Sequence, residues 1–279
     1  MIALQTAEQS LRDGDPLLAL QQLQEQVRAS PADARLRIFL FQLLAVLGQW
    51  DRALAQLELA STLDVSALAM TQMYREAIRC EVLRGQVFAG KKSPMIFGQP
   101  EPWLALLIES LLVAGRGQPA QSEQLRAQAY EEADAASGTL DSQRFEWIAD
   151  ADSRLGPALE AIINGNYYWL PFTRLSQVVI EPPADLRDVV WMPAHFIFSN
   201  GGEAVGLIPT RYPASDSSGD ALLALSRKTV WTEATPGVDA YHGLGQRVIA
   251  TDAGETPLME VRKIIIDAPG HEASGAEPE

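Results

Sequence analysis

Cysteine is almost absent from this sequence. Cys80 is the only one in 279 residues, which excludes an internal disulfide and leaves a metal site without the usual pair of thiolates. The chain also lacks the run of about 20 apolar residues that a membrane-spanning helix needs. Its first residues, MIALQTAEQSLRDGD, lack the basic start and apolar core of a secretory signal. We therefore expect a cytoplasmic protein that does not cross a membrane.

Basic residues are scarce. The chain has 22 Lys and Arg against 36 Asp and Glu, a net charge of −14, which repels the phosphate backbone of nucleic acids. We therefore expect no nucleic-acid partner. Arginine far outnumbers lysine among the basic residues, and its planar group contacts carboxylates in pairs, which favours structural ion pairs. The lysines are Lys91, Lys92, Lys228 and Lys263.

A repeat marks the N-terminal part. Two segments align when their residue numbers are offset by 48 − 14 = 34, which is the period of tetratricopeptide repeats. The pairs that keep this offset are Gly14/Gly48, Ala19/Ala53 and Leu23/Leu57. The second repeat departs from the pattern at Val65, where a proline is typical and the first repeat has Pro31. A plain helical bundle is the alternative for this region.

Apolar residues at spacings of three and four predict helices through this half of the chain. The expected helices are 2–12, 16–28, 34–47, 50–62, 66–84, 103–114 and 119–136. Gly90–Pro102 contains several Gly and Pro residues and is expected to form a loop. The last helical pair has a degenerate repeat signature.

After Gly138 the pattern changes to short runs rich in β-branched and aromatic residues, with a hairpin signal at Asn200-Gly201-Gly202. The expected strands are 144–148, 177–180, 195–198, 204–208, 229–232, 247–250 and 261–266, with helices at 156–163 and 220–226. The fold class is thus α+β. We expect a tetratricopeptide-like helical domain over residues 1–137, a strand-rich α/β domain over 138–269, and a disordered acidic tail over 270–279.

Short tetratricopeptide arrays bind ligands on a concave face lined by the first helix of each repeat. Counting back from the two glycine turns predicts the residues of that face. They are Leu4, Glu8 and Arg12 in the first repeat and Arg35, Ile38 and Gln42 in the second. This mixture of apolar and charged side chains suits an amphipathic helix as ligand.

In the second domain, Trp191 and Arg211 lie among prolines and charged residues of the segments around Asp185–Asp188 and Tyr212. Two interpretations stay open. The charges can form salt bridges within the domain, or Trp191 and Arg211 can anchor a partner, because Trp and Arg are favoured at interfaces.

Asp150-Ala151-Asp152 follows an apolar stretch and is the main enzymatic candidate. An Asp-x-Asp at the end of a strand can supply a nucleophile and an acid/base around Mg²⁺, as in a metal-dependent phosphatase or hydrolase. The supporting lysine and acidic pair are missing. We favour a structural role, in which an aspartate caps a helix near Gly156 or pairs with Arg154.

The remaining reactive residues give no site. No two of His195, His242 and His271 have the spacing of metal ligands. Cys80 lies mid-helix among apolar neighbours, where a buried thiol is usual. We therefore expect no metal and no cofactor.

Four ordered segments of the second half resemble one family. They read FEWIADADSRLGPALEAIINGNYYWLPF (145–172), PADLRDVVWMPAHF (183–196), NGGEAVGLIPTRY (200–212) and GLGQRVIATDAGETPL (243–258). Behind tetratricopeptide-like helices, they resemble the ImpE family, also called TagJ or SciE, over nearly the whole chain. The resemblance implies an accessory protein of type VI secretion that associates with the contractile sheath through its small subunit TssB. It further implies systems in which the ATPase ClpV recycles the sheath, and it supplies no catalytic residues.

The sequence thus favours a non-catalytic adaptor that binds TssB, with any link to ClpV indirect. A phosphatase that uses Asp150 and Asp152 is the alternative from another class, and a purely structural subunit is the third. The sequence leaves the oligomeric state open.

Overall fold

The computed structural model describes residues 2–234, 238 and 240–268, with side chains from Gln5 onward. The tail expected at 270–279, His271 and the side chain of Leu4 therefore lie outside the described residues. Within this part of the chain, no helix is long and apolar enough to cross a membrane.

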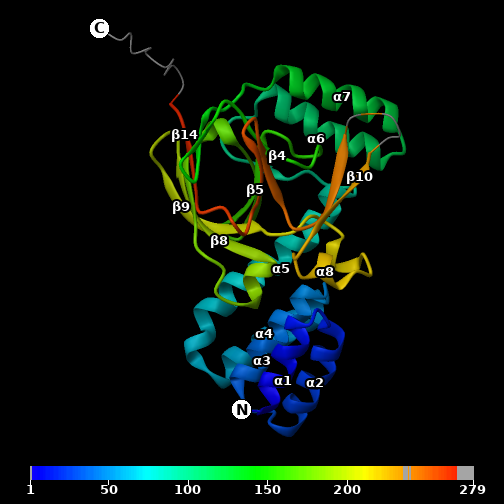
Figure 1. The fold of residues 1–279 in the computed structure, drawn as a ribbon, viewed down its shortest axis with the longest axis vertical. Coiled ribbons are helices and arrows are strands. Elements are labelled where there is room, and N and C mark those ends of the chain that lie inside the picture. Colours follow the sequence, from blue (N-terminus) through cyan, green and yellow to red (C-terminus); the bar gives the residue numbers. More distant parts are fainter. Residues whose placement is uncertain (1, 235–237, 239, 269–279) are drawn as a thin grey trace.

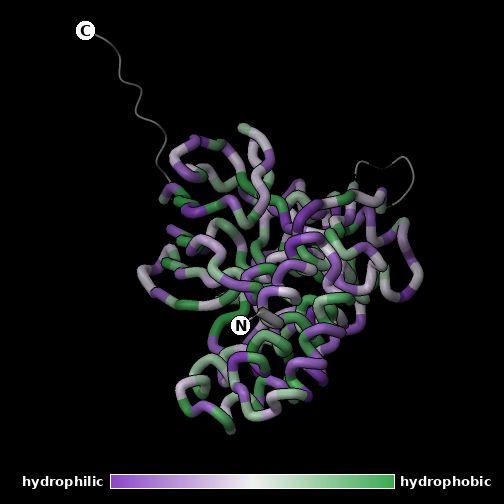
Figure 2. Tube along the Cα trace, turned by 60° about the horizontal axis from the view of Figure 1, so that its bottom comes forward, coloured by the Kyte–Doolittle hydropathy of each residue, from purple (hydrophilic) through white to green (hydrophobic). Residues whose placement is uncertain are grey.

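Helices form the first half of the chain, close to the positions that apolar spacing predicts. They are α1 (Ile2–Arg12), α2 (Pro16–Ala29), α3 (Ala34–Val46), α4 (Trp50–Leu63), α5 (Leu68–Phe88), α6 (Pro102–Gly115) and α7 (Pro119–Glu132). A short helix, α8 (Ala221–Ala224), follows much later. Along the helices the tube alternates between hydrophilic and hydrophobic colours (Figure 2), as expected where one face of each helix is buried.

The first helices recur at a constant interval. The residue numbers at which α2 and α4 begin differ by 50 − 16 = 34, and those of α3 and α5 differ by 68 − 34 = 34. Gly14 and Gly48 form the turns with φ of 84° and 65°, a left-handed conformation that glycine adopts without steric cost. Both turns close with the same bonds, in which Asp15 N–H donates to the Ser10 carbonyl at 2.8 Å and Gln49 N–H to that of Leu44 at 2.9 Å.

The helices divide between the two ends of the molecule (Figure 1). Helices α1–α4 lie at one end and the strands at the other, with α5 running between them. Helices α6 and α7 lie at the strand end, although the sequence predicted them as part of the helical domain.

The strands that follow are short and mostly antiparallel. They are β1 (Met95–Ile96), β2 (Gly138–Leu140), β3 (Gln143–Phe145), β4 (Ile148–Asp150), β5 (Ala158–Ile163), β6 (Asn166–Pro171), β7 (Leu175–Ile180), β8 (Trp191–Phe198), β9 (Glu203–Pro209), β10 (Thr229–Glu233), β11 (Tyr241–Gly245), β12 (Val248–Thr251), β13 (Gly254–Pro257) and β14 (Lys263–Ile266). In the part of the chain that the structure describes, nine strands form one sheet in the order β1-β6-β5-β9-β8-β7-β14-β2-β3, and two smaller sheets have the orders β13-β12-β4 and β10-β11.

The large sheet separates two hydrophobic cores. Its face at β5, β6 and the start of β8 packs against the helices, where Trp169 and Trp191 join apolar residues of α1–α6 in one cluster. Its opposite face forms a second cluster around Phe196 and Ile264. Because the first core contains residues from both ends of the molecule, the helices and the strands are joined by continuous apolar packing.

One prediction about local structure needs correction. Residues 156–163 are expected to be helical, but 158–163 form strand β5 instead. All six β5 residues are buried, since both faces of this central strand are covered, so the alternation that identifies a strand is missing. Strand β2 begins at Gly138, within the region 137–141 where the sequence predicts a domain boundary, and it pairs with β14 through Leu140 and Ile264.

Candidate functional site

The residues predicted for the concave face lie together around one hollow, which we call the concave groove. It has a volume of about 700 Å³ and includes Glu8, Arg12, Arg35, Ile38 and Gln42. Leu11 and Phe39 add apolar lining. Five of the six predicted positions therefore line one groove. Leu4 lies on α1, but its side chain is outside the described part of the chain.

The groove combines an apolar floor with a charged rim. Ile38 and Phe39 are half-buried, whereas Arg12 and Arg35 are exposed. Arg35 contacts Asp33 at 3.3 Å with 88% of its side chain exposed, and Arg12 donates to the side chain of Gln9 at 3.0 Å. Exposed contacts of this kind contribute little to stability and are easily exchanged. Both arginines can therefore turn toward a partner.

The far wall of the groove comes from the strand-rich part. Ala184, Asp185 and Leu186 line it, at the start of a 3₁₀ turn (Leu186–Val189). Asp185 and Asp188 form a capping box for this turn, so the wall has a defined conformation. The sequence did not predict these residues as part of the groove, because their contact with α3 is not local.

Trp191, predicted as one anchor of an exposed partner surface, is instead buried. It has no exposed area, and its ring lies 6.0 Å from that of Trp50 and 5.6 Å from that of Tyr74. Its indole N–H donates to Glu81 at 3.0 Å. This tryptophan therefore joins the helices to the sheet, since it packs against both.

Arg211, the other predicted anchor, is also buried, with 4% exposed. Its guanidinium donates to the carbonyls of Ala45 at 2.9 Å and Val46 at 2.6 Å. These carbonyls end α3, where the helix dipole is negative, and that of Ala45 also accepts the backbone N–H of Gly48 at 3.1 Å. A third bond, to the Ala224 carbonyl at 2.6 Å, fixes the side chain from the other side.

Arg227 repeats this contact on the first hairpin. It donates to the carbonyls of Leu11 at 2.7 Å and Arg12 at 2.9 Å, which end α1. Each of these two residues lies 34 positions before one that Arg211 contacts, since 45 − 11 = 34 and 46 − 12 = 34. Arg211 and Arg227, the two docking arginines, therefore bind equivalent ends of successive hairpins and set both against the strand-rich part.

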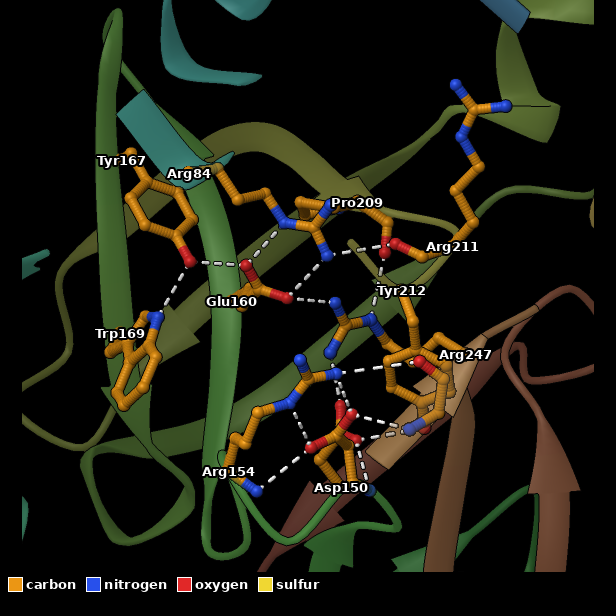
Figure 3. Close-up of polar contacts among 12 residues, drawn as sticks. Arg84, Asp150, Arg154, Glu160, Tyr167, Trp169, Pro209, Arg211, Tyr212 and Arg247 are labelled. Atoms are coloured by element: carbon orange, nitrogen blue, oxygen red, sulfur yellow. Dashed lines mark hydrogen bonds and ion pairs between the residues drawn. The ribbon is translucent and has the colours of Figure 1, made fainter. Parts of the chain in front are cut away.

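A buried ion network lies at the centre of the molecule, and Figure 3 shows Glu160 of β5 between two arginines. Arg84 of α5 donates to its carboxylate at 2.6 and 2.9 Å, and Arg247 binds it from the other side. The hydroxyl of Tyr167 also donates to Glu160 and accepts the indole N–H of Trp169 at 2.7 Å. An acid within the apolar run of β5 is the sequence signal for this centre, and the sequence-based predictions did not include it.

The two aspartates proposed for catalysis belong to the same network. Figure 3 shows Asp150 in it, and the backbone N–H of Asp152 donates to the Asp150 carboxylate at 2.9 Å. Asp150 binds Arg247 and accepts the hydroxyl of Tyr212 at 3.0 Å. Asp152 accepts Arg154 Nε at 2.8 Å and the backbone N–H of Gly243 at 2.8 Å. The pairing of Asp152 with Arg154 confirms one of the structural roles expected from the sequence. The helix cap proposed as its alternative is wrong, because β5 replaces that helix.

The environment shifts the pKa values of the two central acids in opposite directions. Burial raises the pKa of Glu160, but the adjacent guanidinium groups of Arg84 and Arg247 lower it more, to about 2. For Asp150, burial and the neighbouring Asp152 outweigh Arg247 and raise the pKa to about 6. Glu160 is thus the firmly ionised member of the network.

The network has the form of a structural centre. Asp150 and Asp152 are 3% and 0% exposed, and their oxygens already accept arginine, tyrosine or backbone donors. Among the described residues, no group of three His, Cys, Asp or Glu is arranged to hold a metal ion. Cys80 is buried as expected, and burial raises the pKa of its thiol to about 12.

Of the histidines that the structure describes, neither His195 nor His242 forms a hydrogen bond or ion pair with Asp150 or Asp152. His195 lies on β8 and contacts Glu203 at 3.1 Å. His242 lies on β11, where burial and the charge of Arg154 lower its pKa to about 4. It is therefore neutral near pH 7.

Comparison with known proteins places this architecture in a family. A family model described as "ImpE protein" matches residues 142–265. The type VI secretion system accessory component TagJ of Pseudomonas aeruginosa is 48% identical over 258 residues, which cover 92% of this chain and 90% of TagJ. The chain belongs to the ImpE/TagJ family of type VI secretion accessory proteins.

A solved structure shows the same fold. A crystal structure of a protein from Vibrio parahaemolyticus has a TM-score of 0.85 at 25% identity, with 94% of this chain and 97% of that one covered. The ImpE match begins after the helices, whereas the similarity to TagJ and to the Vibrio protein extends over them. The similarity to these two proteins therefore includes the helical end as well as the strands.

Proposed function

We propose that this protein is a non-catalytic, cytoplasmic adaptor of the type VI secretion system. In this proposal it holds a helical segment of the sheath subunit TssB in the concave groove. It thereby assists assembly of the sheath or its recycling by ClpV, with which any contact is indirect. The observation that carries the proposal is the convergence of Glu8, Arg12, Arg35, Ile38 and Gln42 on one groove.

The chemistry of the groove suits an amphipathic helix. Two hairpins set the length of the groove, and the wall at Ala184–Leu186 closes it. One helix or one short segment therefore fills it. Apolar residues of the ligand would lie on Ile38 and Phe39. Arg12 and Arg35 would bind acids along its side, because charged hydrogen bonds of arginine to carboxylates are strong.

The hairpins provide the scaffold for this groove. We infer that α1/α2 and α3/α4 are tetratricopeptide-like repeats, since their turns, closing bonds and helix ends recur at the same interval. We further infer that residues 1–137 and 138–269 work as one unit. The shared core around Trp191 and the contacts of the docking arginines support this inference.

Binding of a labelled TssB helical peptide to the purified protein tests the proposal. A fully buried isoleucine contributes about 1.5–3 kcal/mol, so Ile38→Asp should weaken binding at least about tenfold. Arg35→Glu should weaken it too, through repulsion of the acidic side of the peptide. Both residues are solvent-accessible, and the folded state should therefore survive both changes.

The matched control is Leu59→Asp. Leu59 lies on α4, the second helix of the same hairpin, and is 44% exposed, but it does not line the concave groove. This variant should bind the peptide as tightly as the parent. Unchanged binding by both Ile38→Asp and Arg35→Glu would show that the concave groove is not the site.

A further inference from the structure

Two polar side chains that line the concave groove lack a partner. They are those of Glu8 on α1 and Gln42 on α3. Their residue numbers differ by 42 − 8 = 34, so they occupy equivalent positions in the two hairpins. Within the part of the chain that the structure describes, no hydrogen bond or ion pair joins either side chain to another group.

The amide of Gln42 is buried but not enclosed. Gln42 is only 8% exposed. Even so, its amide is not among the fully enclosed side-chain atoms without a partner, which in the described residues are Arg75 Nε and Thr173 Oγ1. The amide therefore opens into the concave groove. A buried polar group without a hydrogen bond destabilises the fold, and a ligand in the groove can supply the bond that Gln42 lacks.

Glu8 adds a negative charge beside this amide. Its side chain is half-buried, and Arg12, one turn further along α1, donates to Gln9 at 3.0 Å rather than to Glu8. An ionised carboxylate only accepts hydrogen bonds, and the amide oxygen of Gln42 accepts them too. A guanidinium group presents five N–H donors in a planar fork, so it can bind the carboxylate by two bonds and still donate to the amide.

Helices α1 and α3 run in the same direction, because both end against the strand-rich part, where Arg227 and Arg211 bind their last carbonyls. Positions along the two helices can therefore be compared. On α1, Arg12 follows Glu8 by 12 − 8 = 4 residues, and on α3, Arg35 precedes Gln42 by 42 − 35 = 7 residues. The two arginines thus lie on opposite sides of the Glu8/Gln42 pair along the groove.

This order of charges sets a pattern for a helical ligand. At 1.5 Å per residue, Arg12 lies about 6 Å and Arg35 about 10 Å from the pair along the helix axes. Spacings of four and seven residues return to the same face of an α-helix. A ligand helix that lies along α1 and α3 can therefore present one face to Arg12, to the Glu8/Gln42 pair and to Arg35.

We propose that the ligand helix carries a basic residue at its centre, bound jointly by Glu8 and Gln42. Acidic residues four positions to one side and seven to the other bind Arg12 and Arg35, and apolar residues between them lie on Ile38. This inference rests on the proposed function, in which a helix occupies the groove, and it adds the chemistry that selects that helix. A helix with an acid at its centre is repelled by Glu8.

The probe is an alanine-rich helical peptide, acetyl-EAAELAARAALEAAE-amide, titrated into the full chain by isothermal calorimetry. Glutamates lie four and seven residues from the arginine on both sides, so the design fits either direction of the bound helix. An analogue with glutamine in place of the arginine loses the charged hydrogen bonds and should bind at least about tenfold more weakly. An analogue with a central glutamate should bind more weakly again.

Glu8→Arg tests the charge of the pair. It should weaken binding of the arginine peptide at least about tenfold and strengthen binding of the glutamate analogue, which exchanges the preference of the groove. The matched control is Glu25→Arg. Glu25 is exposed on α2 of the same hairpin and does not line the groove. This variant changes the net charge equally and should leave both affinities within about twofold, because solvent and salt screen a distant charge.

Gln42→Leu separates recognition from folding. Leucine removes the amide that lacks a partner, so thermal melting should show a fold at least as stable as that of the parent. Binding of the arginine peptide should nevertheless fall at least about threefold, because one acceptor is lost. Unchanged affinity of this stable variant would show that the amide does not bind the basic residue.

Equal binding of the arginine and glutamine peptides would overturn the inference, as would equal effects of Glu8→Arg and Glu25→Arg. Failure of the arginine peptide to bind a chain that binds the TssB peptide would overturn it too. If Ile38→Asp still weakens binding of the TssB peptide, the concave groove remains the site and only the central basic residue is excluded.

Discussion

In the concave groove the side chain of Arg35 is 88% exposed, whereas that of Arg247 in the ion network has no exposed area. Arg35 has one weak contact, with Asp33. Arg247 has two acids and the Pro209 carbonyl around it. The same residue type therefore has two functions. Exposure leaves the charge of Arg35 free for a partner, and burial commits that of Arg247 to the fold.

The largest loss of stability is expected when the buried arginine, Arg247, is removed. Arg247→Ala leaves Asp150 and Glu160 facing an empty space without their shared cation, which should cost about 3–5 kcal/mol of unfolding free energy. Chemical denaturation followed by circular dichroism measures this loss. A loss below about 1 kcal/mol would mean that the network does not hold the core together.

Glu160→Gln should also destabilise strongly, in a way that depends on pH. The pKa of Glu160 is lowered from 4.5 to about 2 in the folded protein. Its ionised form therefore stabilises the fold above pH 4.5, and this contribution is lost as pH falls toward 2. The difference in stability between parent and variant should accordingly be larger at pH 7 than at pH 3. Equal differences at both pH values would contradict the lowered pKa.

The docking arginines are expected to contribute unequally. Arg211 is buried, and its loss removes the donor of the Val46 and Ala224 carbonyls, so Arg211→Ala should cost roughly 2–3 kcal/mol. Arg227 makes the equivalent contact while exposed, so Arg227→Ala should cost only about 0.5–1.5 kcal/mol. Hydrogen exchange should show faster opening of α3 in the first variant and of α1 in the second. The reverse order would contradict the role assigned to burial.

Asp150→Asn tests whether Asp150 has a structural or a catalytic role. The pKa of Asp150 is raised from 3.8 to about 6, so its contribution to stability falls as pH rises between these values. Relative to the parent, the variant should therefore lose less at pH 7 than at pH 4. We expect no turnover in either protein. Mg²⁺-dependent hydrolysis of a generic phosphoester, abolished by this substitution, would establish the phosphatase alternative instead.

The smallest change in stability is expected when the exposed arginine, Arg35, is removed. Arg35→Ala removes only a solvent-exposed pair with Asp33 and should change the unfolding free energy by no more than about 0.5 kcal/mol. Thermal melting beside Arg247→Ala measures the contrast directly. A loss as large as that of Arg247→Ala would mean that the groove arginine has a structural role.

Local sequence signals predicted the helical end well. Apolar spacing gave α1–α4 nearly to the residue, and the constant offset between the two glycine turns identified the positions that line the concave groove. Both signals are encoded along a single helix or in the interval between helices. Tertiary packing does not alter them.

The strand-rich end depended on contacts that a single sequence does not display. The β5 run was interpreted as a helix because burial on both faces removes the alternation of a strand. Trp191 and Arg211 have the residue types of an interface, yet non-local packing against α3 and α5 buries them. The groove wall at Ala184–Leu186 belongs to the same class of contact.

The contact of the docking arginines has a consequence for engineering. Arg211 and Arg227 bind the carbonyls of the same two positions in each hairpin, so these contacts depend on the backbone and not on the side chains at the helix ends. A chimera in which a copy of the second hairpin replaces the first would present the same acceptors to Arg227. The two arginine contacts are thus interchangeable between the hairpins, whereas the packing of Trp50 on Trp191 belongs to the second hairpin and would have to be kept in any graft.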